Sequence, residues 1–538
     1  MKKILAIVLA LVLVAAVAAG CTPTESGNSG TAAEKKIFRT GIAADWETCD
    51  SQVTTNDYTV PLNIFDRLVE IESEGDGLSE IVPGLATEWT VSDDGLVYNF
   101  KLRKNVKFHN GEIFKADDVL FTFERMLTLD YARNTDAMTP ILGAEAMLEG
   151  EATKLEGFKV INDYEIEITL AEPYAPFLAN IATPAGSIYN RKATEAAGLD
   201  FGIIPEKTVG TGPYYLAEWE LNSYSLILAF NDYWNGRAKN DGVRFTIVKD
   251  SEAYRMMFDN GDLDEIDFDD ARTHIPTYLN DPKWKDQIIY GYRVGVYYYS
   301  MNQNLKPFDD VRIRKAFQMA IDRQAILDSP LYSGLGVVHS GVMPAGLIGY
   351  NADLPEIKYD PVEAKRLMAE AGYPDGFDMV IAQMTESPTT LAINELVLAM
   401  LAKVGIRAEI KQYDEATYFS IRGEGELGAY QTSWSADFND PDNFFYSIFA
   451  KQNTTRRSFN YKNEEAMARV EAARYMTDED ARIKEYQDLE KLIIQEDAVW
   501  APLFALQHLW VVQPWVQNYK PLWNGWSGTY YKDIIINK

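Results

Sequence analysis

The stretch that decides the fold is "YDPVEAKRLMAEAGYPDGFDMVIAQM", residues 359–384. Asp360 is a residue type that accepts hydrogen bonds at a helix start, and Pro361 suits the first helical position. Apolar residues then recur at helical spacing until Gly372, a residue type that readily adopts the left-handed conformation after a helix end. A strand-like run follows over 378–384. The stretch therefore predicts a helix that leads into a strand.

The same alternation continues on both sides of this stretch. A second helix is expected over 391–404, and "IRAEIKQY" (406–413) alternates apolar and charged residues as a half-buried strand does. Period-two alternation also predicts strands at 98–103 and 164–170, and an aspartate cap predicts a helix at 309–322. No repeat of 20 to 50 residues is present. Alternating helices and strands predict an α/β fold.

The length of the chain indicates the number of lobes, and its charge excludes one class of partner. A chain of 538 residues exceeds what one hydrophobic core serves, so two or more lobes are expected. The formal net charge of -29 argues against nucleic acid as a partner, because phosphates are recognised mainly by Lys and Arg.

The N-terminus predicts export. Lys2 and Lys3 precede an unbroken apolar run over 4–20, which is the pattern of a signal peptide (1–20). "AAGC" resembles a lipobox that ends in a lipidated Cys21, and the Ser/Thr/Gly-rich segment that follows predicts a flexible tether over 21–36. The alternative is an uncleaved membrane anchor. On the first interpretation the folded part is extracytoplasmic and lipid-anchored to the cell membrane.

The search for catalytic motifs returns no zinc-binding or serine-hydrolase pattern, so no enzyme activity, cofactor or metal is expected. "GEGELG" (423–428) formally fits a dinucleotide loop but follows a helix, so it is interpreted as a plain loop. "DNGDLDEIDFDD" (259–270) lacks calcium-loop spacing and is interpreted as a solvated acidic turn. The four histidines are scattered and are interpreted as surface or packing residues. These features indicate an exported binding protein.

A family resemblance sharpens this interpretation. "PGLATEWTVSDDGLVYNFKLRKNVKFHNGEIFKADDVLFTFERML" (83–127) closely resembles the signature block of extracellular solute-binding protein family 5. The likeness continues in order through "VGTGPYYL" (209–216), "MNQNLKPFDDVRIRKAFQMAID" (301–322) and "LAKVGIRAEI" (401–410). Members of this family are peptide-, nickel- and oligosaccharide-binding receptors of ABC importers. The resemblance covers essentially the whole mature chain.

The resemblance implies a two-lobed periplasmic-binding-protein-like α/β fold (type II) with an extra α+β domain inserted in the first lobe. The implied division is lobe I at 37–75, 200–300 and 505–538, the extra domain at 75–200, and lobe II at 301–504. A solute bound between the lobes would be delivered to an ABC importer permease. The protein is expected to act as a monomer.

The resemblance also implies the ligand site. In the peptide receptors of the family, an Asp in a W-x-x-D pattern accepts the ligand's α-ammonium group. Here that pattern is Trp434, Ser435, Ala436 and Asp437, within "WSADFNDPDNFF" (434–445). Asp440 and Asp442 of the same segment are interpreted as turn and capping residues, and Phe444 and Phe445 as core.

The far end of the ligand is less defined. The arginine that holds the carboxylate in dipeptide receptors aligns with Met384, beside Gln383, and another arginine of the oligopeptide pattern is replaced by Gln431. Longer peptides, an oligosaccharide stacked on aromatic rings, or another non-peptide solute therefore stay open. A nickel or metallophore receptor is a third option, although no histidine sits at a family-matched ligand position. An exported hydrolase would need a nucleophile and a base that no motif supplies.

Overall fold

The computed structural model describes residues 35–54, 58–73, 79–385, 387–526 and 529–538. The chain divides into Met1–Lys35 and Lys36–Lys538, and the second unit is described below. The predicted signal peptide, Cys21 and nearly all of the tether lie outside the described residues. Within the described ranges, no helix combines the length and the apolar character that a membrane span requires.

The stretch at 359–384 folds as its sequence predicts. Helix α11 (Pro361–Glu370) begins after Asp360, whose side chain accepts hydrogen bonds from the backbone N–H groups of Val362 and Glu363. Gly372 has φ +92° just beyond the helix end. Strand β15 (Phe377–Met384), helix α12 (Pro388–Lys403) and strand β16 (Ile406–Tyr413) follow, with β15 and β16 parallel and Phe377 opposite Ile406. The predicted α/β pattern is confirmed here.

An eight-stranded sheet contains β15 and β16. Its main path runs β11-β18-β13-β17-β15-β16, with β12 and β14 also pairing with β18. The remaining strands of this sheet are β11 (Glu265–Asp267), β12 (Ile288–Tyr292), β13 (Gly295–Ser300), β14 (Gly336–Val338), β17 (Ala429–Ser435) and β18 (Trp500–Val512).

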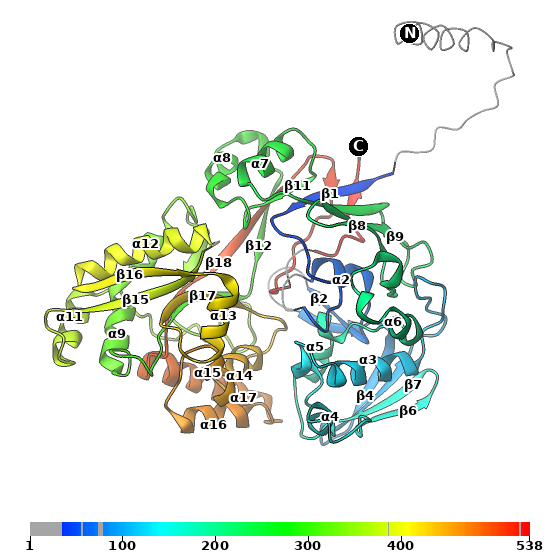
Figure 1. Cartoon of the computed structure of the whole chain (residues 1–538), viewed down its shortest axis with the longest axis horizontal. Coiled ribbons are helices and arrows are strands. Elements are labelled where there is room, and N and C mark those ends of the chain that lie inside the picture. The colour runs from blue at the N-terminus through cyan, green and yellow to red at the C-terminus, as the bar shows by residue number, and fades with distance from the viewer. Residues whose placement is uncertain (1–34, 55–57, 74–78, 386, 527–528) are drawn as a thin grey trace, which may run out of the picture. The chain divides into compact units, whose positions relative to one another are not determined.

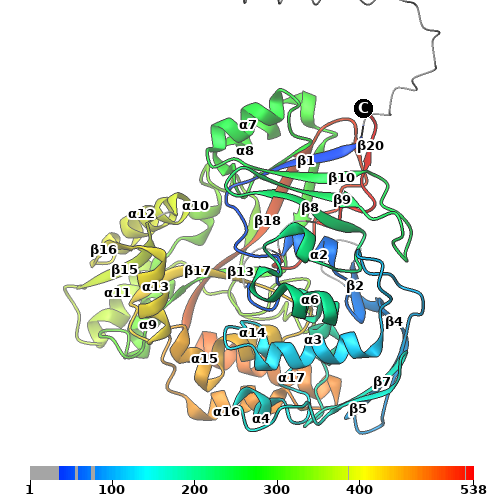
Figure 2. The same cartoon turned by 45° about the vertical axis from the view of Figure 1, so that its right-hand side comes forward.

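Strand β18 joins two regions of the fold. Its first residues, Trp500 to Phe504, pair with β13, whereas Gln507 to Val512 pair with β12 and β11. Figures 1 and 2 show β18 in red, passing from the region of β17 to that of β11. The consecutive strands β12 and β13 both pair antiparallel with β18 and form the second segment between the two regions. Two crossing segments are what the family resemblance implies.

The other sheets lie around the first and last parts of the described chain. One has the order β1-β10-β9-β8 and another β4-β5-β7-β6, and two hairpin-like pairs are β2-β3 and β19-β20. Their bounds are β1 (Ile37–Ile42), β2 (Val69–Ser73), β3 (Ser79–Pro83), β4 (Ala86–Val91), β5 (Val97–Leu102), β6 (Phe158–Asn162), β7 (Glu165–Thr169), β8 (Tyr214–Glu220), β9 (Tyr224–Ala229), β10 (Gly242–Ile247), β19 (Val516–Gln517) and β20 (Ile535–Ile536). Strands β5 and β7 confirm the period-two predictions within one residue at each end.

Helices cover these sheets and form a separate group beside β17. In the first part of the chain they are α2 (Thr59–Ile64), α3 (Ala116–Thr128), α4 (Ala144–Leu148), α5 (Phe177–Ile181), α6 (Arg191–Ala197), α7 (Ser251–Asp259) and α8 (Ile275–Leu279). Later helices are α9 (Val311–Ala320), α10 (Arg323–Leu327), α13 (Glu415–Gly423), α14 (Asp442–Phe449), α15 (Lys451–Arg456), α16 (Glu464–Ala473) and α17 (Glu479–Glu490). Short 3-10 turns occupy 135–137, 184–186, 198–200, 205–207, 272–274 and 282–284, and a π-helical turn spans Lys491–Glu496.

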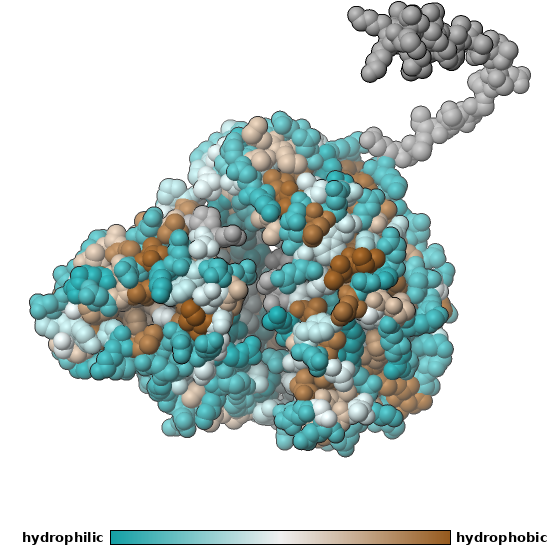
Figure 3. Space-filling model, viewed as in Figure 1, coloured by the Kyte–Doolittle hydropathy of each residue, from teal (hydrophilic) through white to brown (hydrophobic). Residues whose placement is uncertain are grey.

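Large aromatic residues build the core where the sheets meet the helices. Trp500 of β18 stacks on Tyr298 of β13 with 3.9 Å between ring centroids, and Phe449 packs against Trp500 at 5.2 Å. Phe444 and Phe445 are fully buried, as predicted. The surface of this unit is hollowed between the part around α12 and the part around β8 and β9 (Figure 3).

The structure corrects two predictions. The helix expected over 309–322 is α9 alone, because Asp322 caps a second helix, α10, by accepting from the N–H of Ala325. The acidic stretch 259–270 is not a solvated turn. It contains β11, and the buried Asp264 pairs with Arg39 at 2.7 Å and Lys538 at 3.0 Å. These cations come from the two ends of the described chain, so local sequence did not reveal them.

Candidate functional site

The W-x-x-D segment lies where β17 leaves the eight-stranded sheet. Gly295 of β13 is opposite Ser435, and the N–H of Ala436 donates to the carbonyl of Val294 at 2.8 Å. The carbonyl of Ala436 accepts from the N–H of Gly525 at 2.9 Å. A crossing segment and the C-terminal loop therefore fix the backbone immediately before Asp437.

Asp437 has a carboxylate that lacks a cationic hydrogen-bond partner within the described residues. The side chain is half-buried. One oxygen accepts from the Asn443 amide at 3.0 Å, and Asn443 in turn accepts from the N–H of Asp437 at 3.0 Å and from the Trp434 indole at 3.2 Å. Burial raises the pKa of Asp437, an effect that the Asn443 hydrogen bond and the positive charge of Arg457 partly offset. Asp437 thus presents a carboxylate that Asn443 orients and that is partly withdrawn from water.

Asp440 and Asp442 differ from Asp437 because both are buried in ion pairs. Asp440 pairs with Arg482 at 2.5 Å and Asp442 with Arg474 at 3.1 Å. Asp440 also accepts from the N–H of Asp442 at 2.8 Å at the start of α14, so the predicted turn role is confirmed in part. The ion pairs were not predicted, since both arginines lie more than 30 residues further along the chain.

Tyr58 approaches Asp437 from the first part of the chain. The N–H of Tyr58 donates to the carbonyl of Trp526 at 3.2 Å, and the adjacent Gly525 bonds to Ala436, so Tyr58 lies near the W-x-x-D segment. Burial raises the pKa of the Tyr58 hydroxyl, and the negative charge of Asp437 adds to the effect. The hydroxyl donates to the carbonyl of Thr54 at 2.9 Å and accepts from the Asn134 amide at 3.1 Å. Tyr58 is therefore held in place by Thr54, which precedes it in the chain, and by Asn134 from a distant segment.

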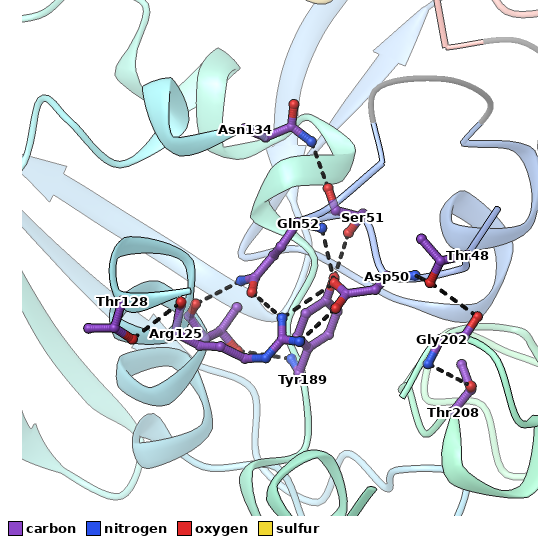
Figure 4. A network of polar contacts seen from close by, with 11 residues as sticks. Thr48, Asp50, Ser51, Gln52, Arg125, Thr128, Asn134, Tyr189, Gly202 and Thr208 are labelled. Carbon is purple, nitrogen blue, oxygen red and sulfur yellow. Dashed lines mark hydrogen bonds and ion pairs between the residues drawn. The ribbon is translucent and has the colours of Figure 1, made fainter. Parts of the chain in front are cut away.

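A buried ion pair anchors that loop (Figure 4). Asp50 accepts from Arg125 of α3 at 2.6 Å and from the Tyr189 hydroxyl at 3.0 Å, and Arg125 also donates to Gln52. The Asn134 amide donates to the carbonyl of Ser51 at 2.7 Å. Side chains of three distant segments thus fix residues 50–52, which precede Tyr58 in the chain.

Arg457 contacts the W-x-x-D segment, and Arg422 lies near Arg457, because Ser458 donates to the carbonyl of Arg422 at 2.9 Å. The Arg457 guanidinium lies 4.4 Å from the Trp434 ring centroid, and its Nε donates to the carbonyl of Ser447 at 2.8 Å. Arg422, in α13, lies 4.6 Å from the Phe419 ring centroid. Arg457 and Arg422 therefore bring positive charge near the W-x-x-D segment, although neither belongs to the predicted motif.

The structure separates the predicted residues of the far end. Gln383 is buried and its side-chain oxygen accepts from Asn394 of α12 at 2.8 Å, so it belongs to a polar contact inside the α/β layer. Met384 packs beside a small apolar cluster that includes Tyr430. Gln431 is buried and its amide donates to the carbonyl of Thr432 at 3.2 Å. Only the W-x-x-D part of the predicted set gathers around Asp437.

Sequence reasoning did not identify Tyr58, Asn443, Arg422 or Arg457. Asn443 alone had a local signal, because it follows Asp437 by six residues at the start of a helix. The other three come from distant segments, and nothing in their own neighbourhoods distinguishes them. No group of three or more His, Cys, Asp or Glu in the described ranges is arranged to hold a metal ion.

Comparison with known proteins agrees with this architecture. The fold is similar to that of an ABC transporter-associated periplasmic binding protein from Helicobacter pylori in complex with the peptide STSA. The TM-score is 0.78 at 26% identity, and the match covers 94% of this chain and 99% of that one. The protein is a two-lobed solute-binding protein of the periplasmic-binding-protein type with mixed helix and sheet content, as predicted.

Sequence comparison defines the family. A model of the bacterial extracellular solute-binding proteins, family 5 Middle, matches residues 80–456, so the chain belongs to the bacterial extracellular solute-binding proteins, family 5. It is 31% identical over 472 residues to heme-binding protein A of Haemophilus influenzae, covering 85% of this chain and 84% of that protein. It is 30% identical over 482 residues to the dipeptide-binding protein of Escherichia coli, covering 86% of each. The predicted family is confirmed.

Proposed function

We propose that this protein is the substrate-binding receptor of an ABC importer and captures short peptides by their free α-ammonium group at Asp437. The observation that carries the proposal is the Asp437 carboxylate, which is half-buried, oriented by a neutral amide and without an ion pair within the described residues. Peptide binding by similar proteins from Escherichia coli and Helicobacter pylori supports it. The function is capture and delivery, without chemistry on the solute.

The Asp437 carboxylate is costly to bury unless a cation pairs with it. Hydrogen bonds between an ammonium and a carboxylate are worth about 1.5 to 3 kcal/mol each. A buried carboxylate without a cation is costly, so closing the site favours an ammonium-bearing ligand. Because burial raises the pKa of Asp437, its charged form is lost earlier on acidification than for an ordinary aspartate. Peptide affinity should therefore fall as the pH falls through this raised pKa.

The proposed motion is closure of two lobes about the crossing segments. We assign lobe I to 37–75, 200–300 and 505–538 with the extra domain at 75–200, and lobe II to 301–504. The change of partners along β18, from β13 to β12 and β11, supports a boundary near residue 505. Tyr58 would then approach the ligand from one lobe and Asp437 from the other. A ligand that contacts both lobes stabilises the closed state by its differential affinity for it.

The test compares Asp437→Asn with the wild type by isothermal titration calorimetry. Free-amine tripeptides should bind the variant at least about ten-fold more weakly, whereas N-acetylated peptides should bind both proteins equally. Asp353→Asn, an exposed aspartate in a turn, is the matched control. Equal losses for free-amine and N-acetylated peptides would refute the assignment of Asp437.

We further propose that Cys21 is lipidated after removal of 1–20 and that the receptor works as a monomer with a membrane permease. The lipobox resemblance and the extracellular family support this. Cys21→Ala should move the protein from the membrane fraction to the soluble fraction of the producing cells, without changing the affinity of the folded part. A variant that stays in the membrane fraction would contradict lipid anchoring.

An oligosaccharide or another non-peptide solute is the alternative ligand. Trp434, the tryptophan of the motif, has its indole N–H bonded to Asn443 and Arg457 against its ring. It is therefore not an open platform for a sugar. Saccharide binding that persists in Asp437→Asn would favour the alternative.

A further inference from the structure

Arg422 and Arg457 are two guanidinium groups without a carboxylate in the part of the chain that the structure describes. Neither forms an ion pair there, and the buried Nε of Arg422 has no hydrogen-bond acceptor. Glu424 and Glu426 follow Arg422 closely, but both are exposed and neither pairs with it. Burial lowers the pKa of Arg457, and the nearby charge of Arg422 acts in the same direction. The hydroxyl of Ser458, the residue after Arg457, donates to the carbonyl of Arg422 at 2.9 Å, so the two arginines are neighbours in the fold.

Arginines with little solvent exposure elsewhere in this structure have compensating partners. Arg125 and Arg482 bond to aspartates at 2.6 and 2.5 Å. Arg314 has no ion pair within the described ranges but donates to backbone carbonyls of Phe308 and Asp497, both at 2.7 Å. Among the described residues, Arg422 has neither kind of side-chain partner, and the Arg457 guanidinium donates only to the carbonyl of Ser447. Both side chains are half-buried, and since charges withdrawn from water are normally paired, the two arginines indicate a missing anion.

Arg457 lies 4.4 Å from the ring centroid of Trp434, in the same W-x-x-D motif as Asp437, and its positive charge partly offsets the raised pKa of Asp437. This region therefore contains one carboxylate, that of Asp437, and two guanidinium groups, those of Arg422 and Arg457. An α-ammonium group bound at Asp437 neutralises that carboxylate, and the two arginines then require two negative charges from the ligand. A peptide with a neutral side chain supplies only its α-carboxylate.

We propose that Arg422 and Arg457 select peptides that carry one more carboxylate than ammonium, that is, short acidic peptides. This inference rests on the proposed function, since it needs the ammonium at Asp437. Trp434 links the two subsites, because its indole bonds to the Asn443 that orients Asp437 and its ring contacts Arg457. The positions where the family's peptide receptors place arginines, Met384 and Gln431, carry no charge here. The arginines from α13 and from the end of α15 supply it instead.

The experiment measures affinities of four tripeptides for the wild-type protein by isothermal titration calorimetry. Ala-Ala-Glu and Ala-Ala-Gln have nearly the same shape and differ by one charge. Their C-terminally amidated forms remove the α-carboxylate and so distinguish it from the side-chain carboxylate. We expect Ala-Ala-Glu to bind about ten-fold more tightly than Ala-Ala-Gln, and each amide to bind more weakly than its acid.

Single substitutions show which arginine causes the preference for the acidic peptide. Arg422→Gln and Arg457→Gln should each reduce the preference for glutamate over glutamine, whereas Arg456→Gln, an exposed neighbour in α15, should leave it unchanged. If a variant fails to fold, the affinities of the four peptides for the wild-type protein still test the inference. Equal affinities of Ala-Ala-Glu and Ala-Ala-Gln would overturn this inference and leave the proposed function intact. Absence of binding by all four peptides would overturn both.

Discussion

Tyr174 makes a contact that should exist only when the lobes are closed. It follows β7 of the four-stranded sheet, and its hydroxyl donates to Asp442 of α14 at 2.8 Å, with both side chains buried. By the proposed division, Tyr174 belongs to the extra domain of lobe I and Asp442 to lobe II. Asn443, which orients Asp437, directly follows Asp442. The contact therefore connects closure to the loop that would bind the ligand.

Tyr174→Phe removes this hydrogen bond with almost no change in volume. Arg474 and Tyr486 contact the other carboxylate oxygen of Asp442, at 3.1 and 3.4 Å, so the oxygen facing Tyr174 loses its hydrogen bond. A hydrogen bond to a charged group is worth about 1.5 to 3 kcal/mol. Because opening of the cleft lets water reach the oxygen, the lower value applies, and it corresponds to about a ten-fold change in the closing equilibrium.

The assay is peptide affinity by calorimetry together with the melting temperature of the ligand-free protein. We expect about ten-fold weaker binding by Tyr174→Phe. Tyr486→Phe is the matched control, since its hydroxyl faces the same carboxylate from α17, within the same proposed lobe. It should leave affinity unchanged. An unchanged affinity in Tyr174→Phe, or equal losses in the two variants, would refute a contact that depends on closure.

Two further predictions concern stability. Arg125→Leu leaves Asp50 buried without its cation, so the free energy of unfolding should fall by about 3 to 5 kcal/mol in urea denaturation; a loss below about 1 kcal/mol would show that water compensates Asp50. Burial raises the pKa of Glu490 to about 7 despite hydrogen bonds from the N–H groups of Val342 and Met343, so the folded state favours the protonated form. Relative to Glu490→Gln, the wild type should be most stable below pH 4.5 and lose about 3 kcal/mol as the pH rises through 7, measured by urea denaturation across pH. A difference that does not change with pH would contradict this.

The sequence by itself determined the local elements and the family. The cap at Asp360, the left-handed Gly372 and the alternation of 406–413 act within a few residues, so they predicted α11, β15 and β16 closely. The W-x-x-D pattern is equally local, because Trp434 and Asp437 lie in one segment. The resemblance singled out Asp437 as the ligand residue and the local pattern assigned Asp440 and Asp442 to the turn, but the ion pairs of the last two could not be predicted.

Only the tertiary structure decided how the charges of the site are paired. Arg474 and Arg482 compensate Asp442 and Asp440, whereas among the described residues the Asp437 carboxylate accepts only from a neutral amide. The same holds for Arg422 and Arg457. Only the tertiary structure brings α13 and the end of α15 together and shows that neither arginine has a carboxylate partner among the described residues. Burial and charge pairing are set by residues that are distant in sequence, so a local pattern can show that a carboxylate is present but not whether it has a partner.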